Sequence, residues 1–514
     1  MDDRLTRREL FRLAAAGMTA AAGRPAWAGA GAELIWGIHI SLAPVWFDPA
    51  ENSGIITPFM VLYALHDAIV KPMPGQPLAP SLAESWTKSE DGLTYEFALR
   101  QGAKFHNDDP VTADDVKFSF DRYRGTSHDL LKARVAEVAA LDPRHVRFTL
   151  KEPWSDFLTF YSTASGAGWI VPRRYIEKVG DDGFKKAPVG AGPYKFVSFT
   201  PGVELVFEAF EPYWRKPPSI KRLVWKVIPE ETTRLAALKR GEVDIAYSIR
   251  GELAEELQRT PGLSLKPALV QGVFCLYFPD QWDPKSPWHD ERVRRAASLA
   301  IDREGTNQAL TLGYSKITGN PLVPEKYEFF WQPPTPQYDP EKAKQLLAEA
   351  GFPNGFDAGD YYCDSSYANL GEAIVDNLQA VGIRVRLRPI ERAAFIKGYA
   401  ERTFKNVIQA GPAPFGNAAT RFESYVVKGS PFVYGSYPDI DQLYQQQAVE
   451  QDPKRREAIL HKMQQLVYER TVFAPIWQLA FLNGIGPRVG ESGFGLISGF
   501  PYTAPYEDLT LKSA

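Results

Sequence analysis

The segment that most constrains the fold runs from Pro80 to Arg122, where a strand pattern leads directly into a helix pattern. Apolar residues first alternate with polar or small ones, the period of a strand with one buried face; these positions are Leu93, Tyr95, Phe97 and Leu99. Thr112 then lies three residues ahead of Asp115, a spacing typical of a helix start. The segment predicts strand, turn and helix, and it contains no nucleophile motif, phosphate loop or metal cluster.

The same alternation continues along the chain. The clearest helix is expected over 340–350, because Asp339 is a good N-cap, Pro340 suits the first helical position and Gly351 ends the pattern. Other helices are expected over 232–240, 290–303, 369–381 and 453–470, and strands over 32–39, 194–199, 203–210, 243–247 and 383–388. At 514 residues the chain is too long for a single core, so an α/β protein with two or three domains is expected.

The net charge and the residue composition make several classes of function unexpected. The formal net charge of −3 leaves no basic footprint, so nucleic acid is not an expected partner. The seven histidines are scattered and no pair has the spacing of metal ligands, so neither a metal site nor a cofactor is expected. Cys275 and Cys363 are the two cysteines, and we expect them to remain unbridged thiols.

Residues 1–28 have the pattern of an export signal. Arg7 and Arg8 precede the weakly apolar run Leu13–Ala22, which is too short to span a bilayer, and Ala26–Ala28 is a small-x-small cleavage site. This arrangement resembles a twin-arginine signal peptide; the alternative is a cytosolic chain with a basic amphipathic start. No cysteine lies near the cleavage site, so we expect a soluble periplasmic protein without a lipid anchor.

One motif suggests an enzyme. Ser85 and Lys88 fit the S-x-x-K pattern of acylases in which lysine activates a serine nucleophile. Such enzymes need further S-D-N and K-T-G motifs, and the sequence contains neither. We therefore expect no catalytic residues and a structural loop ahead of the 93–99 strand, with a secreted serine acyl hydrolase as the alternative.

Longer stretches of the sequence are more specific to one protein family than this four-residue motif. The order LAESW–DGLTYEFALRQGAKFH–P-T-ADDV within 80–122, ALKRGEVDIAY at 237–247 and YDPEKAKQLLAEAGFPNGF at 338–356 resemble the family 5 solute-binding proteins of bacterial ABC importers. The resemblance implies a two-lobed clamshell fold with an extra subdomain on the first lobe. The first lobe would comprise 29–55, 190–270 and 485–514, the subdomain 56–189 and the second lobe 271–484. The hinge would lie at Val270, Gln271, Asn483 and Gly484.

The resemblance also implies a function. The protein would capture a small polar solute, peptide-like, opine-like or a chelated metal, by lobe closure. As a monomer, it would deliver the solute to a permease driven by separate ATPase subunits. A ligand-sensing partner of a chemoreceptor is a second alternative with the same fold.

The ligand residues are expected near the loop at 409–421. Peptide-binding relatives place a Gly-Trp segment and an aspartate there, and the aspartate pairs with the ligand's amino group. This chain has no tryptophan in that loop and no carboxylate before Glu423. A buried ammonium without its counter-charge is costly, so a polar or anionic ligand is expected instead. The candidate contacts are Phe415, Asn417 and Arg421, with Trp46, Phe274 and Tyr277 as further possibilities.

Overall fold

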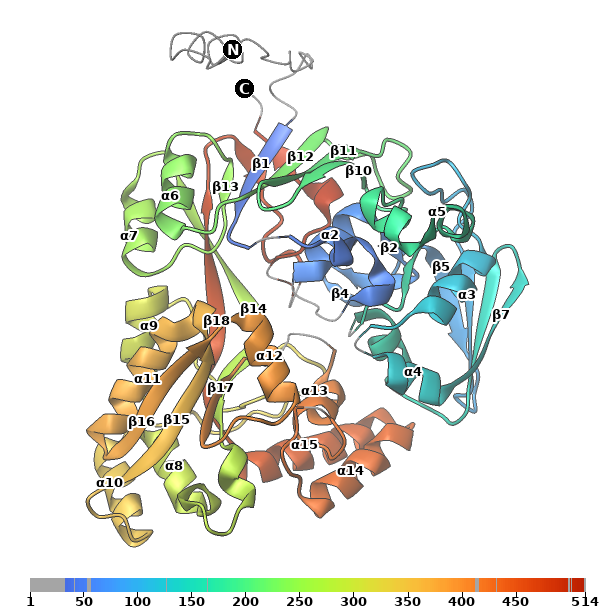
Figure 1. Ribbon diagram of the computed structural model, residues 1–514. Helices are drawn as coiled ribbons and strands as arrows, with labels where there is room; N and C mark the ends of the chain where they lie inside the picture. The colour runs from blue at the N-terminus through green and yellow to red at the C-terminus, as the bar shows by residue number, and fades with distance from the viewer. Residues whose placement is uncertain are drawn as a thin grey trace, which may run out of the picture.

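The computed structural model describes residues 33–40, 42–52, 57–125, 127–163, 165–411, 416–430, 432–497, 500 and 502–512. Three parts surround the centre of the molecule (Figure 1). We call them the first lobe (33–52, 190–270 and 485–512), the subdomain (57–189) and the second lobe (271–484). The predicted signal peptide at 1–28 lies outside the described residues.

One ten-stranded sheet runs through both lobes in the order β10-β11-β12-β1-β13-β18-β14-β17-β15-β16. Its first-lobe strands are β1 (Glu33–Ile38), β10 (Tyr194–Thr200), β11 (Glu204–Ala209), β12 (Arg222–Val227) and β13 (Ile245–Ala246). Its second-lobe strands are β15 (Phe356–Asp364), β16 (Ile383–Ile390) and β17 (Val407–Ala410). The long strands β14 (Ser264–Tyr277) and β18 (Phe473–Ile485) pass from one lobe to the other (Figure 1).

Helices cover the lobes. The first lobe has α6 (Glu231–Lys239) and α7 (Gly251–Arg259), with the short pair β19 (Val489–Glu491) and β20 (Thr510–Leu511). The second lobe has α8 (Glu291–Ala300), α9 (Arg303–Thr311), α10 (Pro340–Glu349), α11 (Ala368–Ala380), α12 (Arg392–Ala400), α13 (Ala418–Tyr425), α14 (Pro438–Val449) and α15 (Pro453–Glu469). The helix predicted over 290–303 is confirmed as α8, but it ends three residues earlier, because the Asp302 carboxylate caps the next helix, α9, by accepting from Gly305 N.

The subdomain is built on a separate four-stranded sheet in the order β5-β6-β8-β7. Its strands are β5 (Ala83–Lys88), β6 (Thr94–Leu99), β7 (Val135–Asp142) and β8 (His145–Leu150), with two small pairs, β2 (Asp67–Ala68) with β9 (Trp169–Ile170) and β3 (Val70–Met73) with β4 (Gln76–Pro80). Its helices are α2 (Thr57–Leu65), α3 (Ala113–Arg122), α4 (His128–Arg134) and α5 (Arg173–Lys186). The predicted alternation along β6 and the cap of α3 are confirmed, since Asp115 accepts from Thr112 N at 2.9 Å.

A buried polar network joins the subdomain to the first lobe. The Asp67 carboxylate pairs with Lys71 Nζ at 2.8 Å and accepts from Tyr213 and Trp214 of the first lobe at 3.0 and 2.6 Å. Asp67 is 0% exposed and Lys71 is 1% exposed. Because a buried charge is tolerated only when paired and hydrogen-bonded, this network holds the subdomain against the first lobe.

The pairing of the strands between the lobes contains two irregularities, one at the predicted hinge and one between Phe274 and Cys275. The register of β14 against β18 is interrupted between Leu269, opposite Ala480, and Val273, opposite Gln478. Val270 and Gln271, the first predicted hinge pair, lie inside this interruption. The strands are therefore least regular where they pass from one lobe to the other.

The second predicted hinge pair lies deeper in the first lobe. Asn483 is 0% exposed; its side-chain oxygen accepts from Ser248 N at 3.1 Å and its amide donates to Lys266 O at 3.2 Å. A Cβ added to Gly484 would come within 2.5 Å of a Leu238 methyl group, so this strand packs closely under α6. Both residues are built into the first-lobe core, away from the register interruption.

Helix α10 shows how a local pattern becomes core packing. Asp339 caps it by accepting from Lys342 N at 2.8 Å, as predicted, and Leu347 is 1% exposed. Replacing Leu347 with alanine is expected to lower the free energy of unfolding by about 2–5 kcal/mol, because a cavity remains in the core. Chemical denaturation measures this change. The exposed Lys344→Ala on the same helix is the control and should change little; equal effects would place Leu347 outside the core.

Candidate functional site

Residues that follow the carboxyl ends of the parallel strands come from both lobes. β1 runs parallel to β12 and β13, and β15 runs parallel to β16 and β17. His39 and Arg250 follow β1 and β13 in the first lobe, while Tyr367 and Arg392 follow β15 and β16 in the second. In open α/β sheets, ligands bind outside the carboxyl ends of such strands. These four residues are thus the first to consider as a site.

Aromatic rings from the first lobe form one wall. The His39 ring stacks on Tyr247, with centroids 5.2 Å apart, and the Tyr502 ring lies 4.4 Å from Tyr247. Tyr247 is 0% exposed, and its hydroxyl has no hydrogen-bond partner within the described ranges. In the second lobe, Phe274 meets Tyr367 edge-on at 4.9 Å. The junction is therefore rich in rings with polar edges.

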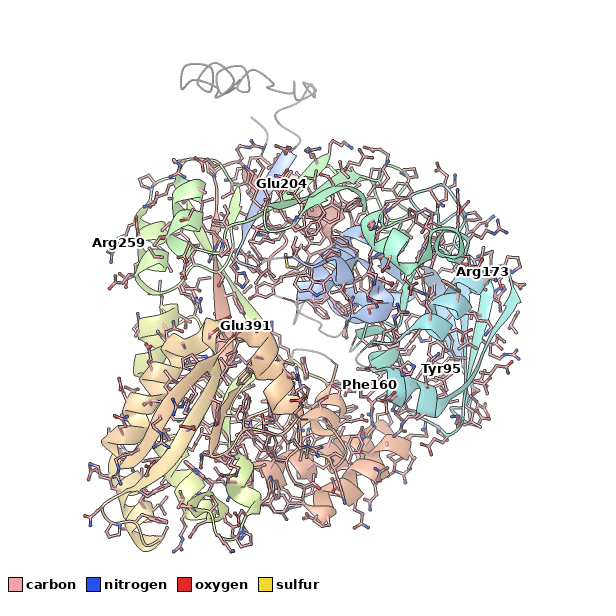
Figure 2. The ribbon with its side chains drawn as sticks, viewed as in Figure 1. Tyr95, Phe160, Arg173, Glu204, Arg259 and Glu391 are labelled. Carbon is pink, nitrogen blue, oxygen red and sulfur yellow. The ribbon has the colours of Figure 1, made fainter. Side chains whose placement is uncertain are left out.

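Two arginines, one from each lobe, lie beside these rings. Arg250 Nη1 donates across the junction to the Ser366 carbonyl at 2.9 Å. Arg392, at the start of α12, pairs with Asp364 at 2.8 Å and also hydrogen-bonds the Tyr367 hydroxyl. Figure 2 labels the preceding residue, Glu391, at the end of α12 that faces the first lobe. The Arg392 side chain is 49% exposed, which leaves much of the guanidinium accessible.

A third guanidinium is buried beneath the rings. Arg234, 1% exposed, donates to the carbonyl oxygens of Ile228, Pro229, Tyr247 and Ser248 at 2.6–2.8 Å. No carboxylate lies within ion-pair distance of it in the part of the chain that the structure describes. Burial lowers the pKa of Arg234 to about 10, so it stays charged at neutral pH.

Positive charges from both lobes act on the ring of His39. The pKa of His39 is lowered to about 3, mainly by burial and then by the charges of Arg234, Arg250 and Arg392 in that order. The imidazole is therefore neutral at physiological pH, and Nδ1, a buried atom, has no hydrogen-bond partner among the residues described. Arg234 and Arg250 belong to the first lobe and Arg392 to the second.

A cavity of about 340 Å³ adjoins Arg250. Its lining comes from α6 and α7 of the first lobe and from α9 and residues 365–369 of the second. A larger cavity, of about 640 Å³, lies wholly within the subdomain, between α3 and β7. Only the smaller of these two is shared between the lobes.

The residues predicted in the 409–421 loop are placed differently from expectation. Asn417 caps α13 by accepting from Thr420 N at 3.2 Å, and its amide donates to Asp156 of the subdomain at 2.7 Å. Arg421 is 2% exposed and donates to the Tyr327 hydroxyl at 2.9 Å, with its guanidinium over that ring. Both side chains serve contacts within the protein. Phe415 lies outside the described residues.

The other three predicted ligand-contact residues lie in different parts of the structure. Phe274 is at the junction, against Tyr367. Tyr277 is 1% exposed in the second-lobe core, where it stacks on Phe473 at 5.0 Å and its hydroxyl accepts from Trp282. Trp46 is half-buried and packs against the large apolar core. Of these three, only Phe274 lies with the junction residues.

The subdomain and the second lobe meet at a second place, which we call the tip contact. Asp156, 1% exposed, pairs with Arg456 of α15 at 2.5 Å and accepts from Asn417. Around it, Ser155 donates to the Glu450 carbonyl at 3.1 Å and Lys88 donates to Gln451 at 2.8 Å.

The S-x-x-K segment has no catalytic geometry. It lies in strand β5, and not in the loop that the sequence suggested. Ser85 pairs with Ala98 and Lys88 with Tyr95 in consecutive register, so the two side chains leave opposite faces of the strand. Lys88 is bonded to Gln451 in the tip contact. Lysine cannot activate this serine. Both Cys275 and Cys363 are buried free thiols, as predicted.

Two kinds of feature are absent from the described ranges. No group of three or more His, Cys, Asp or Glu side chains there could hold a metal ion. No helix there combines the length and apolar character needed to cross a bilayer.

Comparison with known proteins decides the family. The profile of the bacterial extracellular solute-binding proteins, family 5 (middle region), matches residues 77–432. The chain belongs to this family. The two-lobed α/β fold that the sequence predicted is that of family 5 proteins. The structure of the periplasmic binding protein DppA from Helicobacter pylori, in complex with the peptide STSA, has a TM-score of 0.78 at 23% identity and covers 94% of this chain and 98% of that one.

The family 5 relatives are named after different solutes. Heme-binding protein A of Haemophilus influenzae is 33% identical over 310 residues, which are 54% of this chain and 55% of that protein. The glutathione-binding protein GsiB of Salmonella typhi is 30% identical over 335 residues, 62% of this chain and 63% of the relative. The matched stretches thus span less than two thirds of these two relatives.

Proposed function

We propose that the protein is the solute-binding component of a bacterial ABC importer. The observation that carries this proposal is that ring and guanidinium groups following four different strands meet at the junction of the two lobes. No nucleophile–base pair accompanies them among the residues described. The relatives named above, which bind a peptide, heme or glutathione, support a small solute as cargo.

The mechanism we infer is closure of the lobes on the solute. The hinge comprises the interruption at Val270–Gln271 in β14 and the facing Gln478–Ala480 in β18, in place of the predicted Asn483–Gly484. A solute that touches both lobes binds the closed form better than the open one and shifts the population toward it. A separate permease with ATPase subunits would then receive the solute.

We further propose that the protein acts as a monomer in the periplasm. Export would use the twin-arginine signal at 1–28, and the mature protein would be a soluble periplasmic protein without a lipid anchor. The support is the residue pattern of that segment and the extracellular assignment of the family.

A ligand screen with two readouts tests this function. The mature protein is incubated with di- and tripeptides, glutathione, opines, heme and nickel chelates, and thermal unfolding is recorded. We expect at least one compound to stabilise the protein; at about 100 times its Kd the gain is roughly 2.7 kcal/mol. Chromatography should recover that compound unchanged. Turnover of the bound compound, or no stabilisation by any class, would contradict a binding-protein role.

A further inference from the structure

The charges at the lobe junction point to the kind of solute. This step rests on the proposed function. Three guanidinium groups, those of Arg234, Arg250 and Arg392, are the charges that act on His39. Burial raises the pKa of the Tyr502 hydroxyl, and the same three guanidinium groups act against that rise. Two lobes therefore place positive charge around one group of rings.

The local carboxylates offset part of this charge. Asp364 pairs with Arg392, and its other oxygen caps the Ser365–Tyr367 turn by accepting from Ser366 N at 2.9 Å. Glu231 lies 3.7 Å from Arg250 Nε, which has no hydrogen-bond partner within the described chain. Arg234 donates to four carbonyl oxygens, and Glu231 and Glu230 act on its charge from farther away. Among the described residues, the charges that act on His39 are nevertheless those of the three guanidinium groups, so the side of the junction that carries the rings is positive.

Among the described residues, the carboxylates beside the loop where peptide binders place their aspartate are already engaged within the protein. Asp156 is held by Arg456 and Asn417, Glu328 by Asn417, and Glu423 by the Tyr444 hydroxyl. A zwitterionic peptide would bring its ammonium group into a positive field without a free counter-charge. An anion would instead find the half-exposed Arg392 and the guanidinium of Arg250, whose Nε has no hydrogen-bond partner within the described chain. Charge-assisted hydrogen bonds to guanidinium groups are among the stronger polar contacts.

We propose that the protein binds an anionic solute between the lobes, with its acidic groups held by Arg250 of the first lobe and Arg392 of the second. The planar or ring-bearing part of the solute packs on His39, Tyr502 and Tyr367. The acidic group is a carboxylate or a phosphate, which share this chemistry. Because each arginine belongs to a different lobe, the solute's charge also favours closure.

A charge series on one scaffold tests the inference. The probes are Ala-Ala, N-acetyl-Ala-Ala and N-succinyl-Ala-Ala, which carry net charges of 0, −1 and −2 at neutral pH. Glutathione and inorganic phosphate are added as a larger carboxylate and a bare phosphate. Calorimetric titration at low and moderate salt gives each Kd. We expect affinity to rise at each step of the series, roughly tenfold per charge, and to fall with salt.

Matched variants identify the groups responsible. Arg250→Gln and Arg392→Gln should each weaken binding of N-succinyl-Ala-Ala about tenfold or more, with smaller losses for the neutral probe. Two control variants should bind as the wild type does. Arg259→Gln changes a residue at the far end of α7 (Figure 2), and Arg388→Gln changes a residue of the outer strand β16 that pairs with Asp360. Circular dichroism and thermal unfolding establish that every variant is folded, and Arg392→Lys should restore part of the affinity.

The outcomes separate the two proposals. Tight binding of Ala-Ala with no effect of either arginine variant would overturn the anionic site and leave a solute-binding protein. Failure of every anionic probe at millimolar concentration, while a neutral or cationic compound from the screen binds, would overturn it as well. Failure of all compounds in both experiments would contradict the proposed function itself. Binding of phosphate in preference to the carboxylates would identify the acidic group.

Discussion

Replacing Arg234 with methionine is expected to lower the free energy of unfolding by about 3–5 kcal/mol. The four carbonyl oxygens that Arg234 bonds lie in two separate segments, 228–229 and 247–248. A buried acceptor that loses its donor costs about 1–3 kcal/mol. The variant no longer buries a charge, which offsets part of this loss. Equilibrium denaturation with urea measures the difference.

The control lies at the C-terminal end of the same helix. Arg240, just after α6, is exposed and paired with Glu242, and Arg240→Met should change stability little. Arg234→Lys should stabilise less than arginine, because one ammonium group cannot reach four carbonyls in two segments. If Arg234→Met unfolds like the wild type, the guanidinium does not tie these segments together.

Local rules predicted the elements well. Thr112 with Asp115, and Asp339 with Pro340, mark helix starts because a side chain satisfies a free backbone donor within three residues. The helix predicted over 290–303 ends at Ala300 for a related reason. Asp302 caps the next helix by accepting from Gly305 N, three positions on. Apolar periodicity alone does not fix the residue at which a helix ends.

The site was predicted less well, because its residues have no common pattern in the chain. His39, Arg250, Arg392 and Tyr502 are spread over most of the sequence and meet only through the fold. The predicted Arg421 follows the end of β17, a reasonable place, but its guanidinium turns toward Tyr327 inside the second lobe. A usable signal did exist. His39 is the last residue of one predicted strand, and Arg250 and Arg392 each come shortly after another, at the end where α/β sheets place ligands.

The two kinds of subdomain contact differ in what lobe movement requires. The Asp67–Lys71 network joins the subdomain to the first lobe, and both parts can move as one body. The tip contact joins the subdomain to the second lobe, and it must break if the lobes open. A buried ion pair at such a place favours the closed form only while both partners remain.

Replacing Asp156 with alanine is therefore expected to open the ligand-free protein. Arg456 would stay buried without its carboxylate and Asn417 would lose its acceptor, a penalty of about 3–5 kcal/mol when a buried pair loses one member. Opening lets water solvate Arg456, so the penalty falls on the closed form alone. Small-angle scattering should show a larger radius of gyration than for the wild type, while the thermal unfolding temperature changes little.

The variants around the tip contact distinguish a separable contact from a permanent one. Arg456→Leu should open the protein as Asp156→Ala does, and the double variant should add little, because both changes remove one interaction. Lys88→Ala, which removes only the exposed bond to Gln451, is the control and should leave the scattering profile unchanged. If the subdomain and second lobe never separate, the whole cost of losing the ion pair must lower the free energy of unfolding. The radius of gyration must then stay constant. That result would exclude clamshell opening through the tip contact, because the same ion pair would then be part of the folded core.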